Sequence, residues 1–407
     1  MAALRKINQD DLRNHNLSVT LDAMLCANDP LSRADLAKAT GLTKATMSLL
    51  VSMLLESGVV EEGEPIAAAS YGRPSTPLRI HGGRIAGIGL QVNTDGYGCL
   101  ALDINGDTLG REWVNDDMTD CDPQDVFTKL DTMTASLEQQ LARRGCTVAG
   151  AGLALPGVVT GNRLTVARNL GWTGLDLTRF DVVRRLDAGP GNEAKMAAIA
   201  QIPGYATERA DFLNVVDRRD SFIYVSTDVG IGGAIVRDGE VVRGSHGFSG
   251  EIGHLSVAMD GPRCTCGRRG CLEMYAGRRA MVEAAGLADG DLATKSDAVK
   301  RLLDGWRTGD SQITAVIDRA VDALVSAIAS AVNLVDVDTV LLGGLWTHFG
   351  DELTIVLENR LREEIVGPDG MTVHVATPPV AEHPSLYGAA ERGLRRFIDD
   401  PLRFIGA

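Results

Sequence analysis

The sequence lacks three features, and each absence argues against a class of protein. No run of about 18 apolar residues occurs in the 407 residues, so no transmembrane helix is expected. The first residues, MAALRKINQDD, lack the apolar segment of a signal peptide, so we expect a cytoplasmic protein with no membrane partner. The chain also lacks an excess of positive charge, because its net charge is −14. That balance argues against a protein that binds nucleic acid over its whole surface.

The negative charge lies mostly after residue 80. Residues 1–80 contain 8 Lys or Arg and 9 Asp or Glu, whereas the rest of the chain contains 32 and 45. A nearly neutral segment can still bind DNA if its cations face one way, with modest and salt-sensitive contacts to phosphate. The length allows two or three domains, and the apolar content of 44% is ordinary for a soluble globular protein.

Cysteine is scarce, and three of the seven cysteines lie together in CTCGRRGC. Cys264, Cys266 and Cys271 follow His254, and three thiolates with one imidazole satisfy the tetrahedral coordination of Zn²⁺. A disulfide between Cys264 and Cys266 would be strained, and unbound thiols clustered by chance are the remaining alternative. We predict a structural Zn²⁺ site, because four protein ligands leave no open position for water.

Residues 32–58 have the pattern of two short helices joined by a tight turn. Ser32 and Asp35 form a capping-box signature, Gly41 suits the left-handed residue that ends a helix, and Thr43 caps a second helix. VVEEG and TPLRI then predict two strands of a wing, with SYGRPS at or near its tip. A winged helix-turn-helix that binds DNA is favoured over a small helical protein-interaction domain.

In a helix-turn-helix the first residues of the second helix meet base edges in the major groove. Arg73, beside a proline at the wing, is suited to a minor groove. The candidate DNA-binding residues are Ser32, Arg33, Thr43, Lys44, Ala45, Thr46, Ser48 and Arg73.

From residue 82 onward, expected strands alternate with expected helices. GRIAGIGLQV, GYGCLALDINGDTLG and TVAGAGLALPG predict strands, and a 25-residue segment from Cys121 predicts a helix. FIYVSTDVGIGGAIVRDGEVVRG predicts a strand pair, and the helix that begins near Ile313 precedes the strand DTVLLGG. This alternation favours a mixed α/β architecture.

SRADLAKATGLTKATMS, GFSGEIGH and CTCGRRGCLE occur in the order found in the ROK family of sugar-responsive repressors and sugar kinases. The chain resembles the repressor members over essentially its whole length. The resemblance implies an N-terminal winged helix-turn-helix domain and a two-lobed, actin/hexokinase-like α/β body. We expect the domains at 1–80, 81–190 and 191–387, with a C-terminal helix over 388–407 completing the small lobe.

The resemblance also implies a sugar site and the same four zinc ligands. Glu251, His254 and Glu273 contact sugar hydroxyls in the family, Asn192 and Glu193 stand where the family has Asn-Asp, and Asn169 is a weaker candidate. A zinc-bound histidine keeps its second ring nitrogen for a ligand, and carboxylates accept hydrogen bonds from hydroxyls. For each of these residues taken alone, the alternative is a solvated acid or a surface amide without a ligand.

The glycine-rich loops that bind ATP in sugar kinases of this fold are altered. The aligned substitutions are Gln91, Asn93, Thr94 and Asp95 in the first loop and Asp228 and Val229 in the second. Glu193 replaces the catalytic Asp of the kinases, a change that decides little by itself because a glutamate can also act as a base. Carboxylates near a polyanion oppose its binding, so we expect no kinase activity and no catalytic residue.

The sequence therefore predicts a transcriptional regulator, most often a repressor in this family, whose affinity for operator DNA changes when a sugar binds. A palindromic operator implies a homodimer or homotetramer. The alternatives are an active ATP-dependent sugar kinase with a regulatory DNA-binding head, and a body regulated by a protein instead of a sugar.

Overall fold

The computed structural model describes residues 8–65, 75–207, 215–216, 220–290, 293, 295–367 and 371–405. The chain divides into two compact units. The first unit contains residues 1–192, 202–218 and 385–407, and the second contains residues 193–201 and 219–384.

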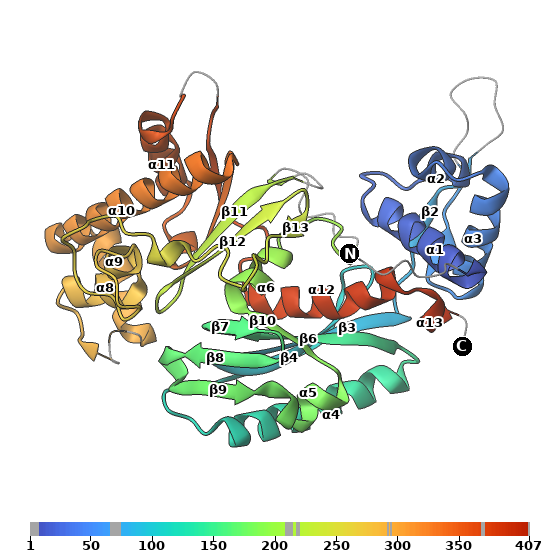
Figure 1. The fold of residues 1–407 in the computed structure, drawn as a ribbon, viewed down its shortest axis with the longest axis horizontal. Helices are drawn as coiled ribbons and strands as arrows, with labels where there is room; N and C mark the ends of the chain where they lie inside the picture. The colour runs from blue at the N-terminus through green and yellow to red at the C-terminus, as the bar shows by residue number, and fades with distance from the viewer. Residues whose placement is uncertain are drawn as a thin grey trace. The chain divides into compact units, whose positions relative to one another are not determined.

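The first unit begins with a small helical region that we call the head (residues 1–80), coloured blue in Figure 1. Its elements are α1 (Gln9–Leu25), α2 (Arg33–Thr40), α3 (Lys44–Glu56), β1 (Val60–Glu62) and β2 (Leu78–Ile80). The predicted capping box of Ser32 and Asp35 and the left-handed Gly41 are confirmed, and β1 pairs antiparallel with β2. The sequence analysis did not predict α1. Arg73 lies outside the described residues.

A five-stranded sheet follows the head, in the order β10-β6-β3-β4-β5. Its strands are β3 (Ile85–Asn93), β4 (Gly96–Asp103), β5 (Thr108–Asn115), β6 (Thr147–Leu155) and β10 (Gly189–Asn192). α4 (Pro123–Arg143) and α5 (Asp181–Arg185) cover one face and α12 (Pro384–Asp399) covers the other (Figure 1). A Cβ on Gly89 would lie 2.2 Å from the carbonyl oxygen of Leu386, so glycine permits α12 to approach the sheet.

Two features of the first unit differ from the prediction or were absent from it. A small antiparallel sheet contains β7 (Val158–Thr160), β8 (Arg163–Ala167) and β9 (Trp172–Asp176), with the 3-10 helices η1 (Arg168–Leu170) and η2 (Leu177–Arg179). The C-terminal helix expected over 388–407 begins earlier, at Pro384, and ends at Asp399 before α13 (Leu402–Ile405). Pro401 lacks the amide hydrogen that a continuous helix needs there.

The second unit is built on another five-stranded sheet, in the order β13-β12-β11-β14-β15. Its strands are β11 (Phe222–Thr227), β12 (Ile231–Arg237), β13 (Glu240–Val241), β14 (Thr339–Gly344) and β15 (His374–Ala376). The helical elements are α6 (Glu193–Ile199), η4 (Ile252–His254), α7 (Glu273–Ala276), α8 (Arg278–Ala284), α9 (Ser296–Arg307), α10 (Ser311–Val335), η6 (Leu345–His348) and α11 (Asp351–Glu364). The predicted alternation of strands and helices is confirmed in both units.

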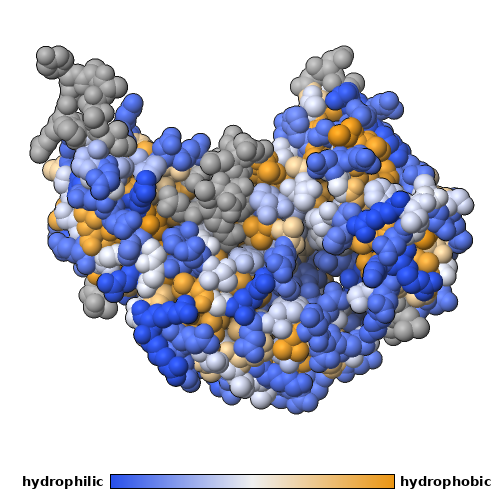
Figure 2. Space-filling model, turned by 180° about the vertical axis from the view of Figure 1, so that it is seen from behind, coloured by the Kyte–Doolittle hydropathy of each residue, from blue (hydrophilic) through white to orange (hydrophobic). Residues whose placement is uncertain are grey.

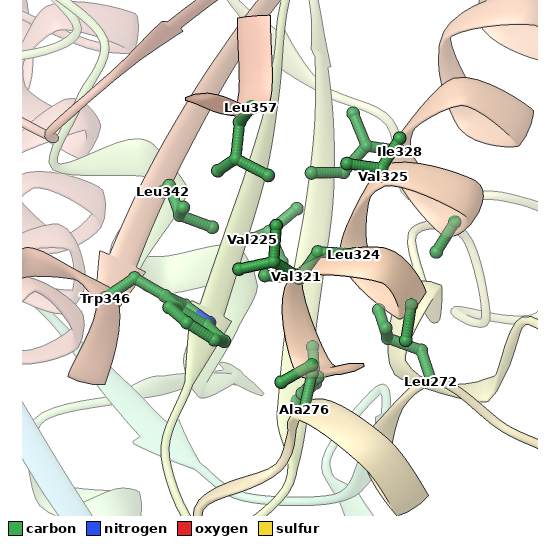
Figure 3. Close-up of a cluster of buried hydrophobic side chains, with 14 of the residues drawn as sticks. Val225, Leu272, Ala276, Val321, Leu324, Val325, Ile328, Leu342, Trp346 and Leu357 are labelled. Carbon is green, nitrogen blue, oxygen red and sulfur yellow. The ribbon is translucent and has the colours of Figure 1, made fainter. Parts of the chain in front are cut away.

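The core of the second unit lies between this sheet and α10. Val225 and Leu342 of the sheet pack with Val321 and Leu324 of α10 and with the buried Trp346 (Figure 3). α10 is apolar along most of its length because it is covered on several sides. This core supports the sheet that carries the segments described in the next subsection.

Hydrophilic residues cover most of the face drawn in Figure 2, with hydrophobic residues interspersed among them. Among the described residues, no helix is both long and apolar enough to cross a bilayer.

Candidate functional site

Four side chains of the second unit form what we call the metal cluster: His254, Cys264, Cys266 and Cys271. One donor atom from each lies within 4.8 Å of every other, so the group can hold a metal ion. The Nδ1 atom of His254 faces the Sγ atom of Cys264 at 3.7 Å, and the Sγ atoms of Cys266 and Cys271 are 3.6 Å apart. Three sulfurs and one imidazole nitrogen are a donor set suited to a tetrahedral ion such as Zn²⁺.

The segment between His254 and Glu273 folds tightly because its backbone closes on itself. The amide of Cys264 donates to the carbonyl of Arg268, and isolated bridges join Ser256 to Cys271 and Arg263 to Arg269. Gly270 has a φ of 66°, and a Cβ there would lie 1.7 Å from the carbonyl oxygen of Ala258. The sequence therefore brings the cysteines together through turns that need glycine.

Two carboxylates lie beside the metal cluster. Glu273 begins α7, and its Oε1 atom lies 2.8 Å from Sγ of Cys264 and 3.4 Å from Nδ1 of His254. Glu251 precedes η4, and burial raises its pKa while His254 and Lys195 oppose that shift. The structure thus places Glu251, His254 and Glu273 in one region, as the sequence motif suggested.

The other predicted sugar-binding residues are distributed over both units. Glu193 is the first residue of α6 in the second unit, and α6 packs on β12, where a Cβ on Gly232 would lie 2.8 Å from the Cβ of Ala194. Asn192 ends β10 in the first unit, and its Nδ2 atom donates to the carbonyl of Gly157 at 2.9 Å. Asn169 is exposed in η1, also in the first unit.

The segment that the sequence predicts to be the first altered phosphate loop is a tight turn between β3 and β4. Gln91 is buried within β3, and the Oδ1 atom of Asn93 accepts a hydrogen bond from the amide of Asp95 at 2.9 Å. The carbonyls of Thr94 and Asp95 accept hydrogen bonds from the segment after β5. The backbone of this turn is therefore occupied by contacts within the protein.

The segment predicted to be the second altered loop connects β11 to β12, and its backbone is also hydrogen-bonded within itself. The amide of Asp228 donates to the carbonyl of Gly230 at 3.0 Å, and Val229 is buried. Next to it, the indole Nε1 of Trp346 donates to Oγ1 of Thr227 at 2.7 Å. The sequence analysis did not single out Trp346, because nothing in its local pattern distinguishes a hydrogen-bonded indole from an ordinary core residue.

The candidate DNA-binding residues of α3 are accessible. Thr43, Lys44, Ala45 and Ser48 are exposed, and Thr46 is half-buried with its Oγ1 2.9 Å from Oγ1 of Thr43. These residues occupy the first two turns of α3, the part that enters the major groove in proteins of this kind.

The two candidate DNA-binding residues at the start of α2 are less accessible than those of α3. Ser32 is buried, and its hydroxyl donates to Oδ2 of Asp35 at 2.6 Å. Arg33 forms an ion pair with Glu62 of β1 at 2.7 Å. Both side chains make contacts within the head. We therefore no longer place Ser32 among the DNA contacts. Arg33 could contact DNA only if it exchanged its ion pair with Glu62 for one with a phosphate.

Lys195 is a further residue of this region that the sequence analysis missed. It lies two residues after Glu193 in α6, and its Nζ atom donates to the carbonyl of Gly247. No sequence signal links Lys195 to Gly247, because the contact exists only once α6 packs beside β12.

Comparison with models of known protein families shows that the family model of the ROK family matches residues 88–392 of the chain.

Two similar proteins are repressors. The xylose repressor of Bacillus subtilis is 28% identical over 264 residues, which cover 63% of this chain, and the chain spans 64% of that repressor's length. The xylose repressor of Caldicellulosiruptor bescii is 25% identical over 374 residues, covering 86% of this chain and 89% of the repressor.

Solved structures with a similar fold include both a regulator and a kinase. A ROK family transcriptional regulator, a homologue of the Escherichia coli Mlc protein, superimposes with a TM-score of 0.76 at 21% identity, covering 97% of this chain and all of that one. A ROK family glucokinase from Streptomyces griseus, in complex with glucose and AMPPNP, gives a TM-score of 0.60 at 22% identity, covering 75% of this chain and 98% of the kinase.

Proposed function

Because the chain belongs to the ROK family, we propose that it is a sugar-responsive transcriptional repressor that binds operator DNA through its head. The observation that carries the proposal is the combination, in one chain, of a helix-turn-helix and the region of Glu251, His254 and Glu273. The similarity to a xylose repressor over 86% of the chain supports it. Xylose or a related sugar is the first effector to test. A repressor of this kind acts in the cytoplasm, where the DNA is.

The head binds DNA with α3 in the major groove. Lys44, Ala45 and Ser48 are exposed on the first turns of α3, so their side chains can reach base edges or phosphates. Thr43 and Thr46 lie at the same end of the helix, and Arg73 belongs to the proposed wing. The chain functions as a homodimer or homotetramer, because a palindromic operator presents two equivalent half-sites.

The metal is a structural Zn²⁺ held by His254, Cys264, Cys266 and Cys271. The Nδ1 atom of His254 is the ring nitrogen that faces the sulfur atoms, which leaves Nε2 to donate to a sugar hydroxyl. When bound, zinc supplies no redox chemistry and only cross-links the segment that carries Glu251 and Glu273. Asn169, Asn192 and Glu193 supply the remaining contacts of the sugar.

The chain is not a sugar kinase. Phosphate loops bind polyanions through free backbone amides, and the amides of Asp95 and Asp228 are instead bonded to Asn93 and Gly230. Each of these two positions also carries a carboxylate, which repels phosphate. Glu193 therefore binds sugar without transferring a phosphoryl group to it.

Two assays on the purified protein test this function together. Thermal unfolding is measured with a panel containing D-xylose, D-glucose and N-acetylglucosamine, and a ligand at one hundred times its Kd raises stability by about 2.7 kcal/mol. ADP release is followed with the same sugars and ATP. Stabilisation by at least one sugar without ADP release supports the proposal, whereas sustained ADP release supports the kinase alternative. A chain that responds to no sugar would favour regulation by a protein.

A further inference from the structure

Lys195 is a partly buried cation next to the residues proposed to bind sugar. It lies on α6, two residues after Glu193, and its Nζ atom donates to the carbonyl oxygen of Gly247. Burial lowers the pKa of Lys195, and the negative charge of Glu251 opposes that shift. An ammonium group is costly to remove from water, so these contacts offset a real desolvation cost.

The contact joins two segments that are distant in the sequence and belong to the same unit. One is α6, which carries Glu193, and the other is the segment 244–250, which leads directly into Glu251. The far end of this segment is held against β12, since a Cβ on Gly250 would lie 2.9 Å from the Cα of Ala234. Lys195 provides an attachment nearer the middle of the segment, at Gly247.

We propose that Lys195 is a positioning residue of the sugar site, which ties the segment 244–250 to α6 and so holds Glu251, the next residue along the chain, in one position. Lys195 acts through Glu251 and the backbone of Gly247, and it does not need to touch the sugar itself. The proposal rests on the proposed function for its ligand, but its effect on the segment 244–250 exists without any ligand.

The test compares Lys195→Met, which removes the charge at similar length, with Lys195→Arg, which retains it. Lys300→Met is the matched control, since Lys300 is an exposed lysine of α9 in the same unit. Amide hydrogen exchange of residues 244–251 is measured in the full-length, ligand-free protein, with metal content as a check on folding. We expect exchange to be roughly tenfold faster in Lys195→Met and unchanged in Lys195→Arg and Lys300→Met. Equal exchange in all four proteins would overturn the proposal.

Calorimetry with D-xylose and D-glucose then separates this proposal from the proposed function. We expect Lys195→Met to bind the sugar about tenfold more weakly than the wild type, and the Arg variant to restore the affinity. If the wild type binds neither sugar, the proposed function loses its support, while the exchange data still decide whether Lys195 holds the segment. Faster exchange with unaltered sugar affinity would show that Lys195 has no positioning role for the ligand.

Should Lys195→Met fail to fold, Lys195→Gln takes its place as a polar variant without the charge. We expect the same faster exchange of residues 244–251 in that variant, and exchange equal to that of the wild type would contradict the attachment at Gly247.

Discussion

Cys266 is the most exposed residue of the metal cluster, and its sulfur lies 3.6 Å from that of Cys271. We expect Cys266→Ser to release the metal and to lower the free energy of unfolding by about 4 kcal/mol, because loss of a structural metal is among the largest single-residue effects. Metal analysis and thermal unfolding measure the two effects. Cys26→Ser, at the residue that follows α1, is the control, and it should retain the metal. Full metal content in Cys266→Ser would refute this ligand assignment.

Glu251 connects the proposed sugar site to the metal cluster, since its carbonyl accepts a hydrogen bond from the amide of His254. We expect Glu251→Ala to bind operator DNA with unchanged affinity and to lose the response to sugar, because the variant lacks a hydroxyl-binding carboxylate. Fluorescence anisotropy with and without sugar measures both. Glu240→Ala, at an exposed position in β13, should behave like the wild type. A variant at Glu251 that still releases DNA with sugar would mean that the sugar binds elsewhere.

Individual site residues could be predicted where side chains of suitable chemistry occur at a recognisable spacing in the sequence. The cysteines and His254 form a recognisable donor set, and the structure brings their donor atoms together. Glu251 and Glu273 were identified through a family motif. Lys195 and the ion pair of Arg33 with Glu62 could not be predicted, because each depends on which elements pack together and not on neighbouring sequence.

At the scale of elements, the capping box of α2 makes the head sensitive to acid. Hydrogen bonds from the side chain and backbone of Ser32 lower the pKa of Asp35. A carboxylate whose pKa is lower in the folded state stabilises the fold above its unfolded pKa, and this contribution is lost as the pH falls through the folded pKa.

We therefore expect Ser32→Ala to destabilise the protein by about 1 kcal/mol at pH 7, the usual cost of losing an N-cap. The difference from the wild type should be full above about pH 4, near the unfolded pKa of an aspartate, and should shrink as the pH falls further through the lower folded-state pKa of Asp35. Chemical denaturation of the intact protein between about pH 2 and pH 7 measures it. A difference that stays constant with pH would show that Asp35 does not contribute through its charge.

α3 is the element of the head that we propose to contact DNA. We expect Lys44→Ala to weaken operator binding by about 1–3 kcal/mol, because it removes a cation from the exposed first turn of α3. Sugar binding should not change. Anisotropy titrations at several salt concentrations measure the effect, with Lys129→Ala on α4 of the same unit as the control. Equal affinities of Lys44→Ala and the wild type would remove α3 from the interface.

Elements with caps, apolar faces or buried runs could be predicted, though not all of them were. α2, α3, α4 and α10 have caps or apolar faces that the sequence displays, and β3, β6 and β11 are buried runs. The helices α1, α9 and α11 were not predicted, although Leu17, Leu21 and Leu25 of α1 recur at helical spacing. The strands β7 to β9 have three to five residues each, which is too short for an alternating pattern to be distinctive.

In the molecule as a whole, the chain crosses between its two units four times, after residues 192, 201, 218 and 384. Residues 193–201 belong to the second unit although their neighbours belong to the first, and the C-terminal residues 385–407 return to the first unit. Such crossings cannot be inferred from local sequence, because they depend on contacts between distant segments. The resemblance to a family suggested only that the C-terminal helix returns to the small lobe.

Within the first unit, the C-terminal helices also contact the head. Arg395 of α12 forms an ion pair with Asp22 of α1 at 2.9 Å, and Oδ1 of Asn14 accepts a hydrogen bond from the amide of Leu402 at 2.9 Å. α12 packs on the five-stranded sheet through its other residues. α12 and the segment that follows it therefore tie α1 to the rest of the first unit.

The proposed function requires that sugar binding and DNA binding are coupled in one molecule. An operator selected from a pool of random duplexes is titrated with the protein at fixed salt, with and without a sugar that stabilises the protein. We expect sugar to change the affinity for DNA about tenfold, equivalent to about 1.4 kcal/mol, and DNA to change the affinity for sugar by the same factor. DNA affinity that is identical with and without every stabilising sugar would contradict it.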